Sequence, residues 1–202
     1  KYPEKIINVT NGITPRRWFL QNNPEMAKEL DKRIGNTWHT NLPAIKKLEK
    51  YVHDQAFREA FTRIKEENKR VLAQYILEKE GVDIPSHFIF DVQIKRMHEY
   101  KRQLLNVLHI ITDYIALKEN PDLPMQPKTY IFAAKAAAGY YMAKKIIKLI
   151  CYLAEDIRKN PKIAEKLNVV YMEDYNVTMS ESLMPASEIS EQISLAGKEA
   201  SG

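Results

Sequence analysis

The chain has 202 residues, of which 45% are hydrophobic and 28% are charged. This balance is typical of a globular protein and excludes a disordered chain or one built mainly of membrane-spanning helices. Cys151 is the only cysteine, so an intrachain disulfide is impossible and a reducing compartment, the cytoplasm, is expected. The net charge of +5 permits an anionic partner, but the charges are spread through predicted helices rather than gathered in one run.

The first third of the chain carries repeated helix-start signals. Thr14, Asn23 and Asp54 each predict an N-cap, the first two with proline as the first helical residue. Over residues 54–80 apolar side chains recur at three- and four-residue spacing, and a glycine then supplies the stop. We therefore predict one long amphipathic helix there, and we assign residues 1–84 to a helical segment that leads into a second domain.

Three short apolar runs in the rest of the chain are rich in strand-forming residues. They cover residues 87–94, 129–134 and 168–173. Their length and composition predict three strands, the first of which is expected to be buried on both faces of a sheet.

Helical periodicity fills the two intervals between these strands, at residues 100–118 and 140–158. The first of the two helices carries one apolar stripe: Leu104, Leu105, Leu108, Ile111 and Ile115. Alternation of strands with helices of this length predicts right-handed parallel βαβ units. The expected fold class is therefore α/β, with residues 85–202 forming the first units of an incomplete Rossmann-like domain that has a parallel sheet of about three strands. Such sheets bind ligands where the carboxyl ends of the strands meet the following helices.

A cluster of cations follows the first predicted strand directly. Lys95, Arg96, Lys101 and Arg102 surround the predicted start of a helix, where free N–H groups and the helix dipole already favour an anion. Cations oppose that dipole, and a bound phosphate would relieve the repulsion. The cluster therefore indicates a phosphate site.

Two other interpretations of this cluster fit the pattern alone. A solvated, charged first turn is equally compatible with the spacing. A nucleic-acid patch is the third interpretation, although the interleaved aromatic residues and the long basic stripe expected of one are missing.

Signatures of other common cofactors do not occur. Six glycines are present and none forms a GxGxxG motif, so a dinucleotide fingerprint is absent. His98 has no second histidine four residues away, so no metal site is predicted.

Four stretches together resemble one family, the α-glucan (glycogen and maltodextrin) phosphorylases. They are TNGITPRRW (10–18), FDVQIKRMHEYKRQLLN (90–106), KAAAGYYMAKKIIKLI (135–150) and EISEQISLAGKEASG (188–202). The second and fourth stretches are long and idiosyncratic, and the four occur in the family's order over nearly the whole chain.

This resemblance implies an enzyme with two domains of the GT-B type and an active site in the cleft between them. The chain would be an internal piece of it, from the start of the C-terminal domain to just before the lysine that forms the Schiff base with pyridoxal phosphate. The implied reaction is reversible phosphorolysis of terminal α-1,4-glucosidic bonds, with orthophosphate and glycogen or maltodextrin as partners. The resemblance also implies a homodimeric parent and a fragment that is inactive alone.

The resemblance assigns roles to individual positions. Lys95, Arg96 and Lys101 match residues around the cofactor phosphate and the substrate phosphate, which makes them the expected catalytic cations. Residues that match the cofactor-binding positions are Trp18, Lys95, Lys101 and Tyr140. Residues that match the sugar-binding positions are Asn11, Tyr100, Glu199, Ala200, Ser201 and Gly202.

Two other functions compete with this interpretation. A nucleotide-sugar glycosyltransferase of the same two-domain shape would need a nucleobase pocket and no pyridoxal phosphate. A basic nucleic-acid-binding module would lose affinity steeply as salt rises.

Overall fold

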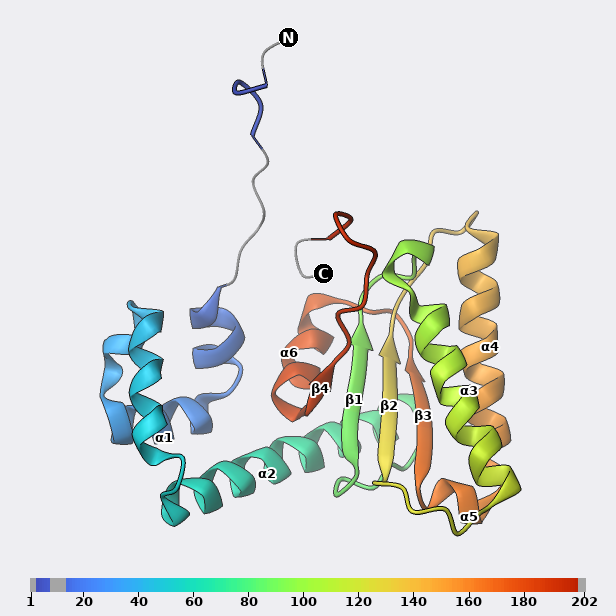
Figure 1. The fold of residues 1–202 in the computed structure, drawn as a ribbon, viewed down its shortest axis with the longest axis horizontal. Coiled ribbons are helices and arrows are strands. Elements are labelled where there is room, and N and C mark those ends of the chain that lie inside the picture. The colour runs from blue at the N-terminus through green and yellow to red at the C-terminus, as the bar shows by residue number, and fades with distance from the viewer. Residues whose placement is uncertain (1–2, 8–13, 200–202) are drawn as a thin grey trace.

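The computed structural model describes residues 3–7 and 14–199, and Figure 1 shows how its elements are arranged. A group of short helices lies at one end of a long helix, α2 (Gln55–Glu80), and a sheet lies at the other end. The short helices are η1 (Arg16–Gln21), α1 (Pro24–Ile34), η2 (Asn36–His39) and η3 (Leu42–Tyr51). Within the described residues no helix is both long enough and apolar enough to cross a lipid bilayer.

The long helix begins and ends where the sequence predicts. Asp54 Oδ1 accepts a hydrogen bond from the Phe57 N–H at 2.7 Å, which satisfies a free donor of the first turn. Gly81 ends the helix with a φ of 68°, a left-handed conformation that costs glycine little.

The same helix joins the two parts of the molecule. Ile64 packs in a small core centred on Trp38, whereas Leu72 and Ile76 pack in the core beneath the sheet. The boundary predicted between residues 84 and 85 falls in the loop that follows α2. The division into domains at that point stays a prediction.

Four parallel strands form the sheet, in the order β3-β2-β1-β4. They are β1 (Ile89–Ile94), β2 (Lys128–Ala133), β3 (Leu167–Met172) and β4 (Ile189–Ser190). The first three lie within about two residues of the predicted strands, and the α/β, Rossmann-like class is confirmed. The short β4 was not predicted, because two residues are too few to produce a periodic signal.

Helices cover both faces of the sheet, as Figure 1 shows. On one face lie α3 (Gln103–Glu119) and α4 (Tyr141–Arg158), with the short α5 (Pro161–Ala164) at its lower edge. The other face is packed against α2 and α6 (Val177–Ala186). The two cores meet in the sheet, because alternate residues of each strand point to opposite faces.

The apolar stripe of α3 is not the face that packs on the sheet. Leu104, Leu105, Leu108 and Ile115 are each between 37% and 50% exposed, and the buried face carries Gln103, Asn106, Val107, Ile110, Tyr114 and Leu117. The helix begins directly after Arg102, which has a left-handed conformation with φ 59°. The spacing of apolar residues therefore predicted the helix correctly but did not predict which of its sides is buried.

We expect Asp54→Ala to loosen the first turn of α2. Loss of an N-cap costs about 1 kcal/mol, so the Phe57 amide should exchange its hydrogen about fivefold faster, as measured by hydrogen-exchange NMR or mass spectrometry. Asp54→Asn keeps a capping oxygen and should exchange like the wild type. Equal exchange in Asp54→Ala and Asp54→Asn would show that the cap does not stabilise this turn.

Candidate anion-binding site at the end of strand β1

The site is built on the segment that follows β1, Lys95–Arg102, which we call the cation loop. Two backbone hydrogen bonds attach its first residues to the end of β2: Lys95 N–H donates to Ala133 O at 3.1 Å and Met97 N–H donates to Lys135 O at 3.0 Å. The Met97 side chain is fully buried in the core under α3 and α4 and anchors the loop. A short helical turn, η4 (Glu99–Lys101), then leads into α3.

Two ammonium groups of this loop converge on one carboxylate. Lys95 Nζ lies 3.3 Å from Glu199 Oε2, and Lys101 Nζ forms an ion pair with Glu199 Oε1. Lys95 Nζ also donates to Gln192 Oε1 at 2.9 Å. The three charged side chains are only 10–16% exposed, so the charges interact through a medium that screens them weakly.

The carboxylate is supplied by the segment after β4, residues 191–199, which runs beside the cation loop (Figure 1). Leu195 N–H donates to Tyr100 O at 2.9 Å, and the Arg102 guanidinium donates to Ile193 O. The Ser194 hydroxyl donates to Glu199 Oε2. Two segments that are almost 100 residues apart in the sequence therefore share one polar site.

The electrostatics of the loop favour a bound anion. Burial lowers the pKa of Lys95, against the opposing effects of Tyr175 and Glu191. Burial also lowers the pKa of Lys101, and the neighbouring charges of Lys95 and Arg96 lower it further. An added anion would stabilise both ammonium groups in their charged form, because it offsets lost hydration and mutual repulsion.

The other predicted residues of the loop lie around this pair. The Arg96 side chain is exposed, but its charge is close enough to affect Lys101. Tyr100 is half-buried, with Lys101 Nζ 5.1 Å from the centre of its ring. The Tyr140 hydroxyl donates to Glu99 Oε2 at 2.8 Å and accepts from the Glu99 N–H at 3.2 Å.

Trp18 lies in a different place from these residues. It lines a shallow pocket with Phe19, Met184 and Pro185, between η1 and the end of α6. Its predicted cofactor role stays a prediction. Asn11, Ala200, Ser201 and Gly202 lie outside the described residues.

One face of β1 carries two buried polar residues and leads to a third just after the strand, a feature that the sequence analysis missed. Asp91, Gln93 and Lys95 are all less than 9% exposed and alternate with Phe90, Val92 and Ile94, which lie in the core on the opposite face. The alternation was visible in the sequence as FDVQIK. The predicted burial of this strand on both faces is confirmed, and the polar side chains on one buried face need polar partners, which the sequence pattern alone did not predict.

Asp91 is the polar residue of this face whose hydrogen bonding is incomplete among the described residues. Its Oδ1 atom is buried and has no hydrogen-bond partner among the described residues. Burial, together with the nearby charge of Glu191, raises the pKa of Asp91 to about 7, although Lys128 opposes the shift.

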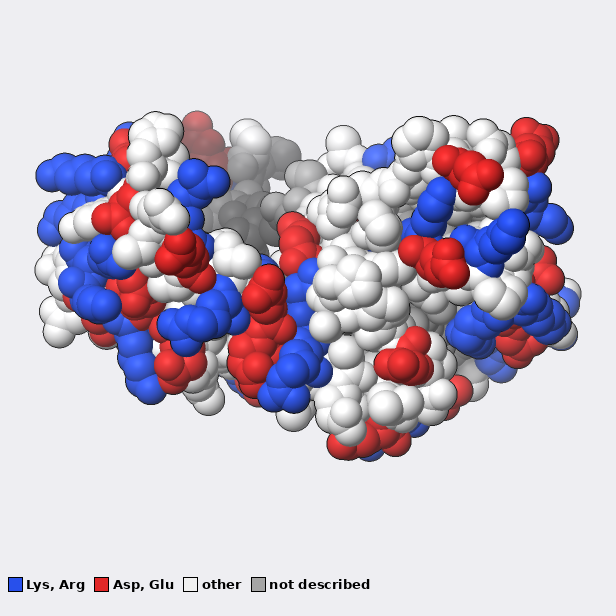
Figure 2. Space-filling view, turned by 90° about the horizontal axis from the view of Figure 1, so that it is seen from below, with Lys and Arg blue, Asp and Glu red and all other residues white. Residues whose placement is uncertain are grey.

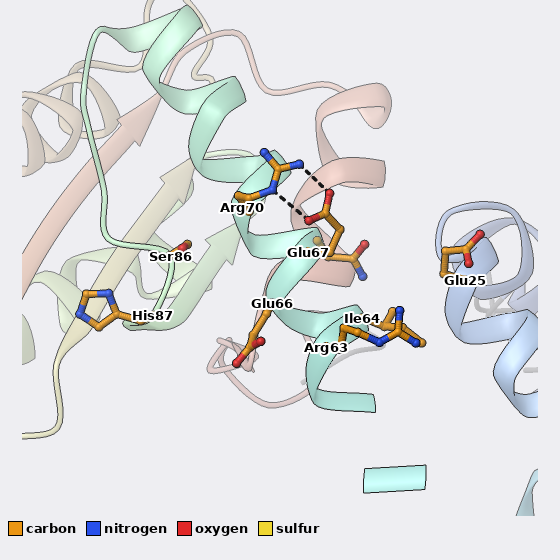
Figure 3. Close-up of a pocket in the computed structure, with 9 residues that line it drawn as sticks. Glu25, Arg63, Ile64, Glu66, Glu67, Arg70, Ser86 and His87 are labelled. Carbon is orange, nitrogen blue, oxygen red and sulfur yellow. Dashed lines mark hydrogen bonds and ion pairs between the residues drawn. The ribbon is translucent and has the colours of Figure 1, made fainter. Parts of the chain in front are cut away.

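A groove elsewhere on the molecule is a weaker candidate for the functional site. Figure 3 shows this groove of about 650 Å³, walled by α1, α2 and the loop before β1. Arg70 and Glu67 at its edge form an exposed ion pair with each other at 2.6 Å. Its charged groups stand on the surface and do not converge, so we place the candidate site at the cation loop.

The surface seen in Figure 2 carries charges of both signs. Lys and Arg side chains alternate with Asp and Glu over this face, without a stripe of one sign. A duplex or single strand of nucleic acid would need such a stripe. This face therefore lends no support to the nucleic-acid interpretation.

Comparison with known proteins gives consistent results over the whole chain. The model of a family described as carbohydrate phosphorylase matches residues 1–202. The chain is 48% identical over 201 residues to a glycogen phosphorylase of Haemophilus influenzae, 46% over 201 residues to one of Synechocystis sp., and 46% over 200 residues to the muscle form from Mus musculus. These alignments cover 99–100% of this chain and 24% of each relative. The chain thus spans about a quarter of the length of the curated relatives it matches.

We expect the stability of the chain to depend on the proton of Asp91. The carboxyl has a pKa of about 7 in the folded state and about 3.9 when unfolded. The folded state binds the proton more tightly, so the stabilisation it provides is complete below about pH 4 and is lost as the pH rises to about 7. Asp91→Asn should therefore raise the midpoint of urea unfolding more at pH 8 than at pH 5.

A matched control is Asp83→Asn, at an exposed position between α2 and β1. It should change the midpoint equally at both pH values. If Asp91→Asn also behaves in this way, the buried proton is not linked to folding.

Proposed function

We propose, from the premise that this chain belongs to the carbohydrate phosphorylase family, that the full-length protein catalyses reversible phosphorolysis of glycogen or maltodextrin. Orthophosphate would attack the anomeric carbon of the terminal α-1,4-linked glucose with net retention. A bond from that carbon to a phosphate oxygen forms, the glycosidic bond breaks, and the shortened glucan takes up a proton. The product is glucose 1-phosphate.

The convergence of Lys95 and Lys101 on one carboxylate, that of Glu199, carries this proposal, because it shows that the two ammonium groups can hold one oxyanion together. Two buried ammonium groups held side by side repel each other unless an anion lies between them. Their position at the carboxyl end of β1 is where sheets of this class bind ligands. Preorganised cations of this kind stabilise charge that develops in a transition state without a further cost of reorganisation.

Each cation would have a distinct part in holding phosphate. Lys95 is buried, the Lys101 side chain is 12% exposed, and both already point to one carboxylate, so they would bind the oxyanion directly. Arg96 is exposed and would close over the phosphate from the solvent side. A guanidinium can bind two phosphate oxygens at once, which suits a ligand that must be oriented as well as held.

The sugar would bind beside this phosphate site. Glu199 contacts both lysines through its two oxygens, so a glucosyl unit bound to Glu199 would lie next to the phosphate. Tyr100 borders the same space. Asn11 and residues 200–202 are proposed to complete the sugar site.

We infer that the full-length protein binds pyridoxal phosphate, with its Schiff-base lysine outside this chain. The residues present fit a phosphate group: Lys95 and Lys101 provide charge, and the Tyr140 hydroxyl contacts Glu99 of the cation loop. His98 Nδ1 is buried near the rings of Tyr100 and Tyr140, without a partner among the described residues. Trp18 would contribute to the pocket from the helical segment. When bound, the phosphate of the cofactor supplies a proton relay or an electrostatic partner for orthophosphate.

Family membership is also the support for the wider context. We infer two domains of the GT-B type with the active site between them, a homodimer, and a location in the cytoplasm. The chain alone would be inactive, because part of the cleft lies outside it. A nucleotide-sugar glycosyltransferase is not favoured by any of the relatives found.

The direct test uses the full-length protein. Incubated with maltodextrin, orthophosphate and a full complement of pyridoxal phosphate, it should release glucose 1-phosphate, which a coupled phosphoglucomutase assay measures. A preparation that contains the cofactor but yields no glucose 1-phosphate from either maltodextrin or glycogen would refute the proposed reaction.

We expect Lys101→Ala in the full-length protein to lower kcat/KM for orthophosphate by about 100- to 1000-fold, the usual cost of removing one group that stabilises transition-state charge. Lys145→Ala is the control, since Lys145 is exposed on α4 and lies against the ring of Tyr141. It should keep wild-type turnover. A value for Lys101→Ala within twofold of the wild type would exclude a phosphate role for this lysine.

A further inference from the structure

Three buried amide side chains lie directly beneath the cation loop. Gln93 of β1 and Gln103 of α3 are each 1% exposed, and Asn106 of α3 is 4% exposed. Buried amides are costly unless their hydrogen bonds are satisfied, and an apolar residue would normally be preferred in such a position. All three have hydrogen-bond partners.

Gln103 holds the first half of the loop. Its Nε2 atom donates to Arg96 O at 3.0 Å and to Lys95 O at 3.4 Å, and its Oε1 atom accepts from the His98 N–H at 3.5 Å. One side chain therefore satisfies three backbone groups of a turn that has no regular structure of its own. An amide can do so because it carries both donors and an acceptor.

Gln93 holds the other end of the same loop. Its Nε2 atom donates to Lys101 O at 3.4 Å, while its Oε1 atom accepts from Asn106 Nδ2 at 3.1 Å. The Asn106 bond orients the amide of Gln93, because it occupies the oxygen and turns the nitrogen toward the loop. Asn106 thus acts on the loop through Gln93.

The backbone groups held in this way belong to the cations themselves. Gln103 binds the carbonyl groups of Lys95 and Arg96, and Gln93 binds the carbonyl group of Lys101. A shift of about 1 Å in such a loop would move the ammonium groups out of the geometry that an oxyanion requires.

We propose that Gln93, Asn106 and Gln103 are positioning residues that hold the two ends of the cation loop, so that Lys95 and Lys101 are preorganised to bind an oxyanion. The proposal rests on the proposed function, because it takes orthophosphate as the anion. Gln93 and Gln103 bind the backbone of the loop, and Asn106 binds Gln93. Their neutral amides hold the backbone without adding a charge that would compete with the phosphate.

The first test is Gln103→Met in the full-length protein, a change that keeps the volume and removes the hydrogen bonds. Steady-state kinetics should show KM for orthophosphate raised about 10- to 100-fold, by analogy with the loss found when the hydrogen-bond partners of a metal ligand are removed. KM for maltodextrin should stay within about twofold. Gln74→Met, at an exposed glutamine of α2, is the matched control and should change neither constant.

A second readout does not depend on activity. Hydrogen exchange of the peptide that spans residues 95–102 should be faster in Gln103→Met than in the wild type, and unchanged in Gln74→Met. If exchange and the KM for orthophosphate both stay at wild-type values in Gln103→Met, the proposal is wrong.

A double-mutant cycle separates positioning from general stability. If Gln103 acts through Lys95, then Gln103→Met should raise the phosphate KM by a smaller factor in Lys95→Ala than in the wild type, since one of the two cations whose backbone Gln103 holds is already gone. Full additivity of the two effects would overturn the proposal. Should Gln103→Met fail to fold, the same cycle is measured with Gln93→Met and Lys101→Ala. If Gln103→Met and Gln93→Met both fail to fold, the amides stabilise the fold rather than position the loop, and the proposal is overturned.

The proposed function fails separately from this inference. If the wild-type protein does not use orthophosphate, the proposed function is wrong. If the wild-type protein is active and Lys95→Ala raises its KM for orthophosphate, but Gln103→Met and Gln93→Met do not, then only the positioning role is wrong.

Discussion

A buried ammonium group must be met by an anion or by strong hydrogen-bond acceptors, and Lys95 imposes this requirement at the end of β1. Its side chain is almost fully enclosed, and Lys101 brings a second positive charge to the same place. Leaving either charge without a partner in this environment would cost several kcal/mol. Glu199 and Gln192 meet the requirement, so the segment after β4 lies against the cation loop.

This requirement also explains the short strand β4. Two residues pair with β1 through Asp91 and Val92, and the Glu191 N–H extends the contact by donating to Val92 O at 2.8 Å. So short a strand has little stability of its own. The ion pairs of Glu199 and the hydrogen bond from Arg102 to Ile193 hold the same segment beyond the strand.

The two faces of β1 have different roles: one packs in the apolar core, and the other leads to the candidate site. Phe90, Val92 and Ile94 contribute to an apolar core with α2 and α6. On the opposite face, Asp91, Gln93 and Lys95 form a column that leads from a carboxyl with a raised pKa, through an amide network, to the candidate site. A satisfied buried polar network specifies one geometry more strictly than apolar packing does, which suits a strand that ends at a binding site.

Local patterns in the sequence were sufficient for the elements and for part of the site. The three longer strands, the helices between them and the cap and stop of α2 depend on residues that are close in the chain, so periodicity and cap chemistry determined them. The cation cluster was readable for the same reason. The buried face of α3, the strand β4, the pairing of Glu199 with two lysines, and the amides beneath the loop were decided only by the tertiary structure, because each depends on which segments meet in space. Charge and hydrogen-bond partners that are almost 100 residues apart leave no periodic signal, and a glutamine reads the same in a sequence whether it lies in water or beneath a loop.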